Sequence, residues 1–311
     1  MKHILLLGAG FSRNWDGWLS NELIGDLLTR ISDDKELASF LQKAKNFEEV
    51  LLFSKGNAVC GWTPDRYQKY MDAIKASFNA MNSSYLQRNF EFCNNINRSI
   101  NRFLGKFDVI FTLNQDLLLE MNYNVSELPN ISPTFPGIRP PPNWRIGSRE
   151  QSQLDDVWIL SNDFSYPVNS QPIFKLHGSV NWLNDDDKEL LVMGNNKIED
   201  IEQSPLLTHY TKEFRMILSQ EDVRLMVIGY SFQDLHINQI ITDAWKKNKF
   251  SMYLVDPLGA KLFKDPAIAN NHREIMECIQ LLGISTRLLS DTFGKDQLEY
   301  EKLLRFFKKG I

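Results

Sequence analysis

The sequence Leu7-Gly8-Ala9-Gly10-Phe11-Ser12 continues directly from the apolar run His3–Leu7. A short, unbroken apolar run of this kind is typical of a parallel strand buried on both faces. Glycines after such a strand let the backbone approach a phosphate closely, and a following helix offers unpaired N–H donors. The order is Gly-x-Gly-x-Ser rather than Gly-x-Gly-x-x-Gly, so a tight turn without a ligand stays an alternative for this segment alone.

Further apolar runs of similar length lie along the chain, and each ends in a polar or glycine-containing turn. They are Phe107–Thr112, Pro172–Leu176, Arg224–Gly229 and Met252–Val255. Together the runs predict an α/β fold, a Rossmann-like parallel sheet with helices on both faces and a helical insertion. Ligands of such sheets bind beyond the carboxyl ends of the strands, so functional residues are expected directly after each run.

Two long segments interrupt the predicted strands. Helix starts at Ser32-Asp33-Asp34 and Thr63-Pro64 precede apolar residues at helical spacing, first from Tyr67 to Met81 and again from Leu86 to Phe103. We interpret residues 30–103 as a helical insertion. The remainder, 1–29 and 104–311, forms the Rossmann core of a single domain spanning 1–311. Residues 122–171 are rich in proline, which favours an irregular loop or lid.

Polar residues follow the second and third runs. Thr112-Leu113-Asn114-Gln115-Asp116 places an amide and a carboxylate two residues apart, where both can reach one sugar. The alternative is that Asn114 or Asp116 only caps a helix over 117–122. Leu176-His177-Gly178 places a histidine at a strand end, and histidine is the side chain that titrates near neutral pH. A purely structural histidine is the alternative there.

The fourth and fifth turns are also polar. In Gly229-Tyr230-Ser231-Phe232-Gln233-Asp234, Ser231 and Asp234 are spaced nearly as in a helix capping box, although the start of a helix is also a ready phosphate site. Val255-Asp256 places an acid at a strand end, where it commonly accepts hydrogen bonds from ribose hydroxyls.

Composition narrows the class of protein. The 311 residues are 43% hydrophobic and carry a net charge of −4, which does not suggest a nucleic-acid partner. No apolar run is long enough for a membrane span or a signal peptide, so we expect a cytoplasmic protein. The three cysteines form no Cys-x-x-Cys pair and the histidines are scattered, so we predict no bound metal. These residues are Cys60, Cys93 and Cys278, and His3, His177, His209, His236 and His272.

The order of the five turns carries more information than any one of them. Gly-Ala-Gly-Phe-Ser (8–12), Thr-Leu-Asn-Gln-Asp (112–116), Leu-His-Gly-Ser (176–179), Gly-Tyr-Ser (229–231) and Val-Asp (255–256) together resemble the sirtuin superfamily. Among its members, the sequence is most similar to bacterial sirtuin-like NADases of antiphage defence. The stretch from Leu191 to Asn238 adds to that similarity.

This resemblance implies a role for each turn. Gly8, Ala9, Gly10 and Ser12 would hold the phosphates of NAD+. Asn114 and Asp116 would face the nicotinamide ribose, and His177 would be the catalytic histidine. Gly229 and Ser231 would contact the phosphate and ribose on the adenosine side, and Asp256 the adenosine ribose. The resemblance assigns no role to Lys197, Asp234 or His236.

The sequence also departs from the sirtuin deacylases. Their four zinc-binding cysteines are missing, and Arg13-Asn14-Trp15-Asp16-Gly17-Trp18 replaces the family's Pro-Asp-Phe-Arg continuation. We therefore expect an NAD+ hydrolase that releases nicotinamide and ADP-ribose, or a cyclic form of it, in abortive-infection defence. It would be activated by a trigger, by self-association into a homo-oligomer or by a companion protein. The alternatives are an NAD or ADP-ribose sensor that recruits a partner, and a zinc-free NAD-dependent deacylase.

Overall fold

A seven-stranded sheet forms the centre of the computed structural model, which describes residues 1–44, 46–51, 62–126, 128, 131–194, 196–264, 275 and 280–308. The strand order is β11-β10-β9-β1-β2-β6-β3, and all of these neighbours pair in parallel. The strands are β1 (Lys2–Leu7), β2 (Val109–Thr112), β3 (Pro133–Thr134), β6 (Gln171–Lys175), β9 (Val223–Ile228), β10 (Ser251–Val255) and β11 (Leu281–Ser285). The predicted Rossmann-like α/β fold is confirmed.

Each of the five predicted apolar runs forms a strand of this sheet, whereas β3 and β11 were not predicted. Both lie at its edges. β3 has only two residues, and β11 contains Gly283 and is mostly half-buried, so neither shows the continuous apolar pattern of an inner strand. The inner strands are different, because β9 is buried along its whole length.

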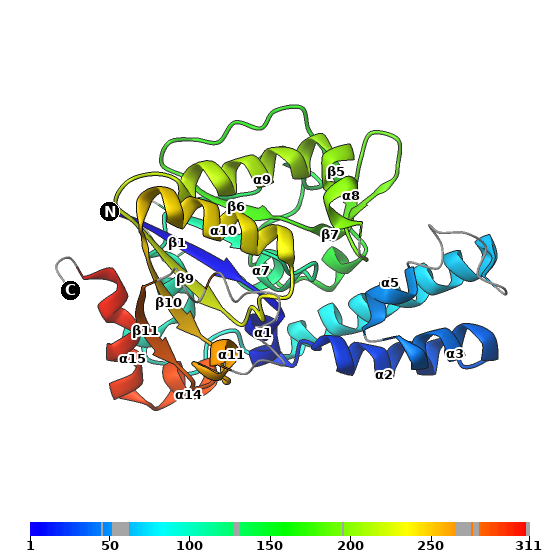
Figure 1. Cartoon of the computed structure of the whole chain (residues 1–311), viewed down its shortest axis with the longest axis horizontal. Coiled ribbons are helices and arrows are strands. Elements are labelled where there is room, and N and C mark those ends of the chain that lie inside the picture. Colours follow the sequence, from blue (N-terminus) through cyan, green and yellow to red (C-terminus); the bar gives the residue numbers. More distant parts are fainter. Residues whose placement is uncertain are drawn as a thin grey trace.

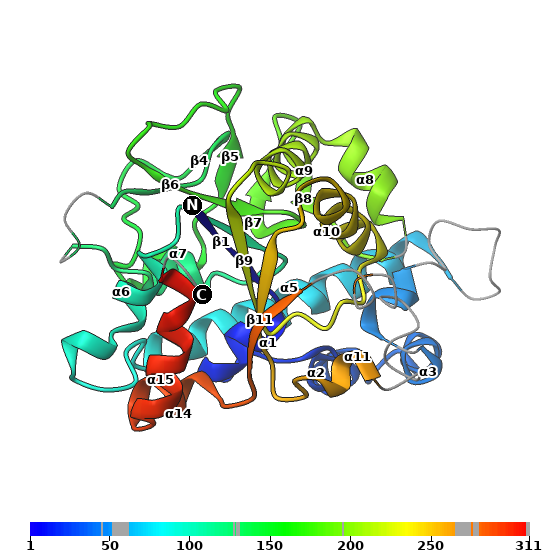
Figure 2. The same ribbon diagram turned by 60° about the vertical axis from the view of Figure 1, so that its left-hand side comes forward.

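Helices cover the sheet on two sides. Figures 1 and 2 show α9 (Pro205–Leu218) and α10 (Leu235–Asn248) on one face, and α14 (Leu289–Gly294) and α15 (Gln297–Leu304) on the other. The shorter helices are α1 (Ala9–Ser12), α7 (Leu118–Asn122), α8 (Lys197–Gln203) and α11 (Lys261–Lys264), with 3-10 turns η1 (Arg13–Trp15), η4 (Gln151–Leu154) and η5 (Arg305–Phe307). Across the described residues, none of the helices combines the length and apolarity that crossing a membrane requires.

A group of helices projects beside the sheet. It contains α2 (Ser20–Arg30), α3 (Lys35–Lys43), η2 (Phe47–Leu51) and α5 (Pro64–Gln87), and Figure 1 shows α2, α3 and α5 side by side. Both predicted helix starts are confirmed. Asp34 Oδ1 accepts from Leu37 N at 3.0 Å, and Thr63 Oγ1 accepts from Arg66 N at 3.2 Å. The division of the chain into core and insertion stays a prediction.

The helical pattern expected over Leu86–Phe103 is wrong. After α5 ends at Gln87, the chain forms only the 3-10 turn η3 (Ile96–Arg98) and the short helix α6 (Ile100–Leu104). Local hydrogen bonds explain why this stretch is not one helix. Glu91 accepts hydrogen bonds from Ser99 Oγ and Ile100 N at 2.6 and 2.7 Å. Its carboxylate thus binds the start of α6, so that a second short helix is favoured over one long one.

A second, smaller sheet was not predicted. Its order is β4-β5-β7-β8, with bounds β4 (Ile138–Arg139), β5 (Trp158–Leu160), β7 (Gly178–Leu183) and β8 (Glu189–Leu191). Residues 122–171 therefore contribute β3, β4 and β5, separated by irregular backbone. The third predicted turn is correspondingly short, because β7 begins at Gly178, two residues after Leu176.

Candidate active site

A cavity of about 810 Å³ opens at the carboxyl ends of the central strands. β1 has β9 on one side and β2 on the other, so the loops that follow β1 and β9 meet where the strand order reverses. The predicted site residues that line the cavity are Gly8, Ala9, Gly10, Asn114, Asp116, His177, Gly229, Ser231 and Asp256. Ser12 is the exception, because it is buried behind the first turn.

The opposite wall comes from the projecting helices. Trp18, Leu19 and Leu23 line it at the start of α2, Phe47 and Glu48 from η2, and Phe78 and Met81 from α5. These side chains are mainly apolar, whereas the sheet side contributes backbone amides and polar groups. A cavity with one apolar wall and several convergent polar groups is typical of a small-molecule site.

The two glycine-containing loops pack directly against each other. Gly10 N donates to Gly229 O at 2.9 Å. Gly229 has φ of +65°, and a Cβ placed on it would lie 2.3 Å from the carbonyl carbon of Gly10. A Cβ on Gly8 would lie 2.5 Å from Gly229 O. Glycine is therefore required on both sides of this contact, whether or not a phosphate binds there.

Asn114 is held in a fixed orientation. Its Nδ2 donates to Gly8 O and to Ser12 Oγ, both at 3.0 Å. Because a carbonyl can only accept, the Gly8 contact determines which end of the amide is nitrogen. Within the described residues, Oδ1 receives no recorded hydrogen bond, and the side chain lines the cavity. Asn114 therefore presents an amide oxygen that can accept a hydrogen bond from a ligand.

Asp116 is more enclosed than the sequence suggested. Its Oδ1 accepts at 3.0 Å from the N–H of Leu118, the first residue of α7, although Leu117 occupies the N-cap position of that helix. Burial raises the pKa of Asp116, and the nearby Lys175 ammonium partly offsets that effect. Lys175 is itself buried, and its Nζ donates to Asp116 O, Glu120 Oε1 and Ser179 Oγ at 2.6, 2.6 and 2.8 Å. Three partners satisfy this buried charge and fix the Asp116 loop.

His177 belongs to a cluster that the sequence did not assemble. Its Nε2 lies 3.1 Å from Nε2 of His236. Ring nitrogens of both histidines and a carboxylate oxygen of Asp234 lie within 4.8 Å of one another. Lys197 Nζ pairs with Asp234 Oδ1 at 2.7 Å and with Glu48 Oε2 at 2.9 Å. The residues without an assigned role, Lys197, Asp234 and His236, thus surround the predicted catalytic histidine, and Glu48 joins them from η2.

Burial controls the charges in this cluster. It lowers the pKa of His177 to about 3, with Lys197 and His236 acting in the same direction and Asp234 against them. The pKa of His236 is also lowered, mainly by burial. Both rings are therefore neutral at pH 7. Activity limited by an unperturbed histidine would fall below pH 6.5, but His177 stays neutral well below that pH.

Asp234 illustrates why the capping explanation was incomplete. It occupies the N-cap position of α10, yet no helix N–H donates to its side chain. The carboxylate pairs with Lys197 instead. Two further predicted residues line the cavity: Ser231 is exposed, whereas Asp256 is buried and its Oδ1 accepts from Leu258 N at 2.8 Å.

A metal ion would have to compete for the same ligands. His177, Asp234 and His236 could hold one by spacing, but the Lys197 ammonium already occupies Asp234 Oδ1. We therefore keep the prediction that no metal is bound. Cys93 Sγ donates to the carbonyl of Phe293 at 3.2 Å, far along the chain from this cluster, while Cys60, Cys278 and His272 lie outside the described residues.

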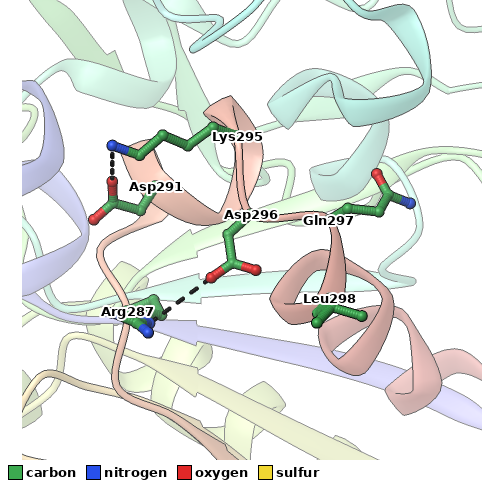
Figure 3. A pocket seen from close by; sticks show the side chains of 6 residues that line it. All are labelled: Arg287, Asp291, Lys295, Asp296, Gln297 and Leu298. Carbon is green, nitrogen blue, oxygen red and sulfur yellow. Dashed lines mark ion pairs between the residues drawn. The ribbon is translucent and has the colours of Figure 1, made fainter.

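A second hollow, of about 540 Å³, lies at α14 and α15 (Figure 3). Its two cations are paired with carboxylates, Lys295 with Asp291 at 3.4 Å and Arg287 with Asp296 at 3.8 Å. Exposed pairs of this kind contribute little energy and no convergent chemistry. The cavity at the strand ends is therefore the candidate site.

A parallel α/β sheet with a glycine-lined cavity at its switch point is the arrangement in which doubly wound α/β proteins commonly bind nucleotides. The family model of the SIR2-like domain matches residues 108–275, which is more than half of the chain. The chain therefore belongs to the SIR2-like family. The match includes Asn114, His177 and the turn at 229–231, and family membership implies NAD-related activity in general. A search of curated proteins found no match.

Sequence reasoning missed Glu48 as a member of the site. It lies 149 positions before Lys197, its ion-pair partner, and no local pattern connects them. Burial raises the pKa of Glu48, and the Lys197 ammonium acts against that. Asp234 and His236 lie six and eight residues after the end of β9, at the start of α10, so the sequence held a usable signal for these two residues.

Proposed function

We propose that this chain hydrolyses NAD+ to nicotinamide and ADP-ribose. The observation that carries the proposal is that Asn114, His177 and the two glycine loops line the same cavity. The backbone amides of those loops suit the pyrophosphate. The apolar wall from α2, η2 and α5 suits the rings of a dinucleotide and limits access of water.

The chemistry requires little from the protein beyond positioning. The nicotinamide of NAD+ is a cationic leaving group, so the C1′–N bond breaks with its electron pair going to the ring nitrogen, and no general acid is needed. The sugar develops oxocarbenium character, as in glycoside cleavage. Asn114 Oδ1 would orient the attacking water. A proton of this water would pass to His177 as the new C1′–O bond forms, and then to solvent.

A sensor of NAD or ADP-ribose is the second candidate function. It is favoured by the low pKa of His177, because a base that binds protons weakly accepts one less readily. Such a histidine would hold a ribose hydroxyl without promoting hydrolysis. The zinc-free deacylase that the sequence left open has no comparable support.

Incubation of the full chain with NAD+ distinguishes these functions. We expect free nicotinamide in the absence of any acyl peptide. Binding measured by calorimetry without nicotinamide release would support the sensor, and release that depends on an acyl-lysine peptide would support the deacylase. Asn114→Ala serves as the inactive reference.

The biological part of the proposal is antiphage defence in the bacterial cytoplasm. Activation would come from a trigger, a companion protein or self-association, and would deplete cellular NAD+. Bacteria expressing the wild-type chain or Asn114→Ala should differ after phage challenge, with NAD+ falling only in the wild-type cells. Equal NAD+ content and equal phage yield in both strains, across a phage panel, would contradict the defence role while leaving the hydrolysis assay to decide the chemistry.

A further inference from the structure

The imidazoles of His177 and His236 are both neutral, and their Nε2 atoms point toward each other. Nε2 of each ring lies 3.1 Å from Nε2 of the other. His177 follows β6 and lines the cavity, whereas His236 comes from the first turn of α10 and lies behind it, outside the residues that line the cavity. His177 is 3% exposed, so the packed atoms around its ring restrict the ring's orientation.

A contact of this length requires one proton between the two nitrogens. If His236 donates, the unprotonated nitrogen of His177 is Nε2, and it is already used by the contact. His177 then has no lone pair left for the cavity. If His177 donates instead, its Nδ1 keeps a lone pair that can accept a proton or a hydrogen bond. Only the second arrangement fits a histidine that accepts a proton from the attacking water.

We propose that His236 is a positioning residue that accepts a hydrogen bond from His177 Nε2–H and so fixes the tautomer in which His177 Nδ1 is the acceptor. This inference rests on the proposed NAD+ hydrolysis. His236 touches neither NAD+ nor the reacting atoms. It acts through His177, in the way that a second-shell carboxylate or carbonyl fixes the tautomer of a metal-bound histidine.

The surrounding charges support this assignment. With Nε2 accepting, His236 carries its proton on Nδ1. A carboxylate oxygen of Asp234 lies within 4.8 Å of a ring nitrogen of each histidine, where its negative charge favours the protonated form that His177 takes when it accepts a proton. Lys197 holds Asp234 in place at 2.7 Å and is held in turn by Glu48 of η2. Gly194 N also donates to Glu48 Oε2, at 3.3 Å. Among the described residues, the charged groups that act on the histidine pair are Asp234 at the start of α10 and Lys197 at the start of α8, and Glu48 of η2 acts through Lys197.

The reaction step then balances without any other group. The water oxygen bonds to C1′, the C1′–N bond breaks with its electron pair passing to the nicotinamide nitrogen, and the water proton moves to His177 Nδ1. The resulting imidazolium keeps its Nε2–H bond to His236, with the Asp234 carboxylate nearby to stabilise the positive charge. The imidazolium finally releases one proton to solvent.

Two substitutions at His236 test the proposal. His236→Leu removes the acceptor and retains bulk, whereas His236→Gln supplies an amide oxygen that can accept from His177. We expect His236→Leu to lower kcat by about 10²-fold, the lower end of what acid–base catalysis contributes. Its KM should change little, because the dinucleotide is held elsewhere, and His236→Gln should restore most of kcat. His209→Leu, in α9 outside the cavity lining, is the matched control with full activity.

Nitrogen NMR of the imidazoles supplies a readout that needs no turnover, so it separates this inference from the proposed function. In the ligand-free wild-type chain, His177 should be protonated at Nε2 and unprotonated at Nδ1. Failure of the wild-type chain to release nicotinamide would remove the proposed function, while the NMR result would still decide the tautomer. His177 protonated at Nδ1 would overturn the inference. So would unchanged kcat in His236→Leu, or stoichiometric zinc bound through the two Nε2 atoms.

Discussion

The Asn114 amide serves the fold, and in the proposed mechanism it also serves the reaction. Its two donated hydrogen bonds tie the second turn to Gly8 and Ser12, and its oxygen faces the cavity. We expect Asn114→Ala to reduce NAD+ hydrolysis by at least about 10²-fold, similar to the loss of one positioned polar group in other active sites.

The fold should survive Asn114→Ala, because the residue is in a loop and is only half-buried. Circular dichroism and urea unfolding would check this alongside the nicotinamide assay. Asn79→Ala is a suitable control, since it removes an exposed amide from α5. Near-normal hydrolysis by a well-folded Asn114→Ala chain would contradict the proposed mechanism.

We expect His177 to affect stability as well as activity. Its pKa is about 3 in the folded chain against 6.5 when unfolded, so the unfolded chain binds the proton more readily. The stability contributed by a neutral His177 is complete above pH 6.5 and is lost as the pH falls from there toward 3. Between pH 7 and pH 5 this amounts to about 2 kcal/mol.

Urea unfolding at both pH values would test the histidine. We expect the free energy of unfolding of the wild-type chain to fall more than that of His177→Gln over this interval, by about 2 kcal/mol. The activity of the wild-type chain should show no acid limb from His177 near pH 6.5. Parallel stability profiles for the two proteins would mean that His177 titrates normally in the folded chain.

At the scale of elements, the contact between the loops after β1 and β9 is the most constrained part of the site. Gly229→Ala would place a Cβ 2.3 Å from the Gly10 carbonyl carbon, in a backbone conformation with φ of +65°. We expect the free energy of unfolding to fall by about 1–3 kcal/mol and NAD+ binding to weaken.

The chain offers a matched control for that change. Gly25 is in the interior of α2, and a Cβ there would meet nothing within 4 Å. Gly25→Ala should therefore raise the free energy of unfolding by about 0.5–1 kcal/mol. Calorimetric unfolding and NAD+ titration of both variants would check the pair. Equal effects of the two substitutions would mean that the loop contact is not tight.

Sequence reasoning performed best where one element determines its own structure. Thr63-Pro64 starts α5 through a cap that involves only Arg66 N. The buried inner strands can be predicted because each is a continuous apolar run. It performed worst where residues distant in sequence determine the local structure. The stretch 86–103 fails as a helix because Glu91 binds the start of α6, and β4, β5 and β8 are too short to show a pattern. The Glu48–Lys197 pair depends on the complete fold.

At the scale of the whole molecule, the cavity lies between the carboxyl ends of the central strands and the helices that project beside the sheet. One wall is formed by the loops at the carboxyl ends of the central strands, and the other by α2, η2 and α5. Glu48 crosses between them by pairing with Lys197, with both side chains mostly buried at 20% and 15% exposure. A ligand that contacts both walls must therefore stabilise them together.

Binding of NAD+ should therefore protect both walls of the cavity from hydrogen exchange. In the His177→Gln chain, where turnover should be slow, saturating NAD+ should slow amide hydrogen exchange in the loops 8–12 and 229–231 and also in 18–23 and 47–51. At one hundred times Kd, binding adds about 2.7 kcal/mol to the stability of the folded chain. Adenosine alone serves as the control, since it lacks the pyrophosphate and the nicotinamide ribose and should protect fewer of these segments. Protection confined to the sheet loops, with 18–23 and 47–51 exchanging as in the free chain, would show that the helical wall takes no part in binding NAD+.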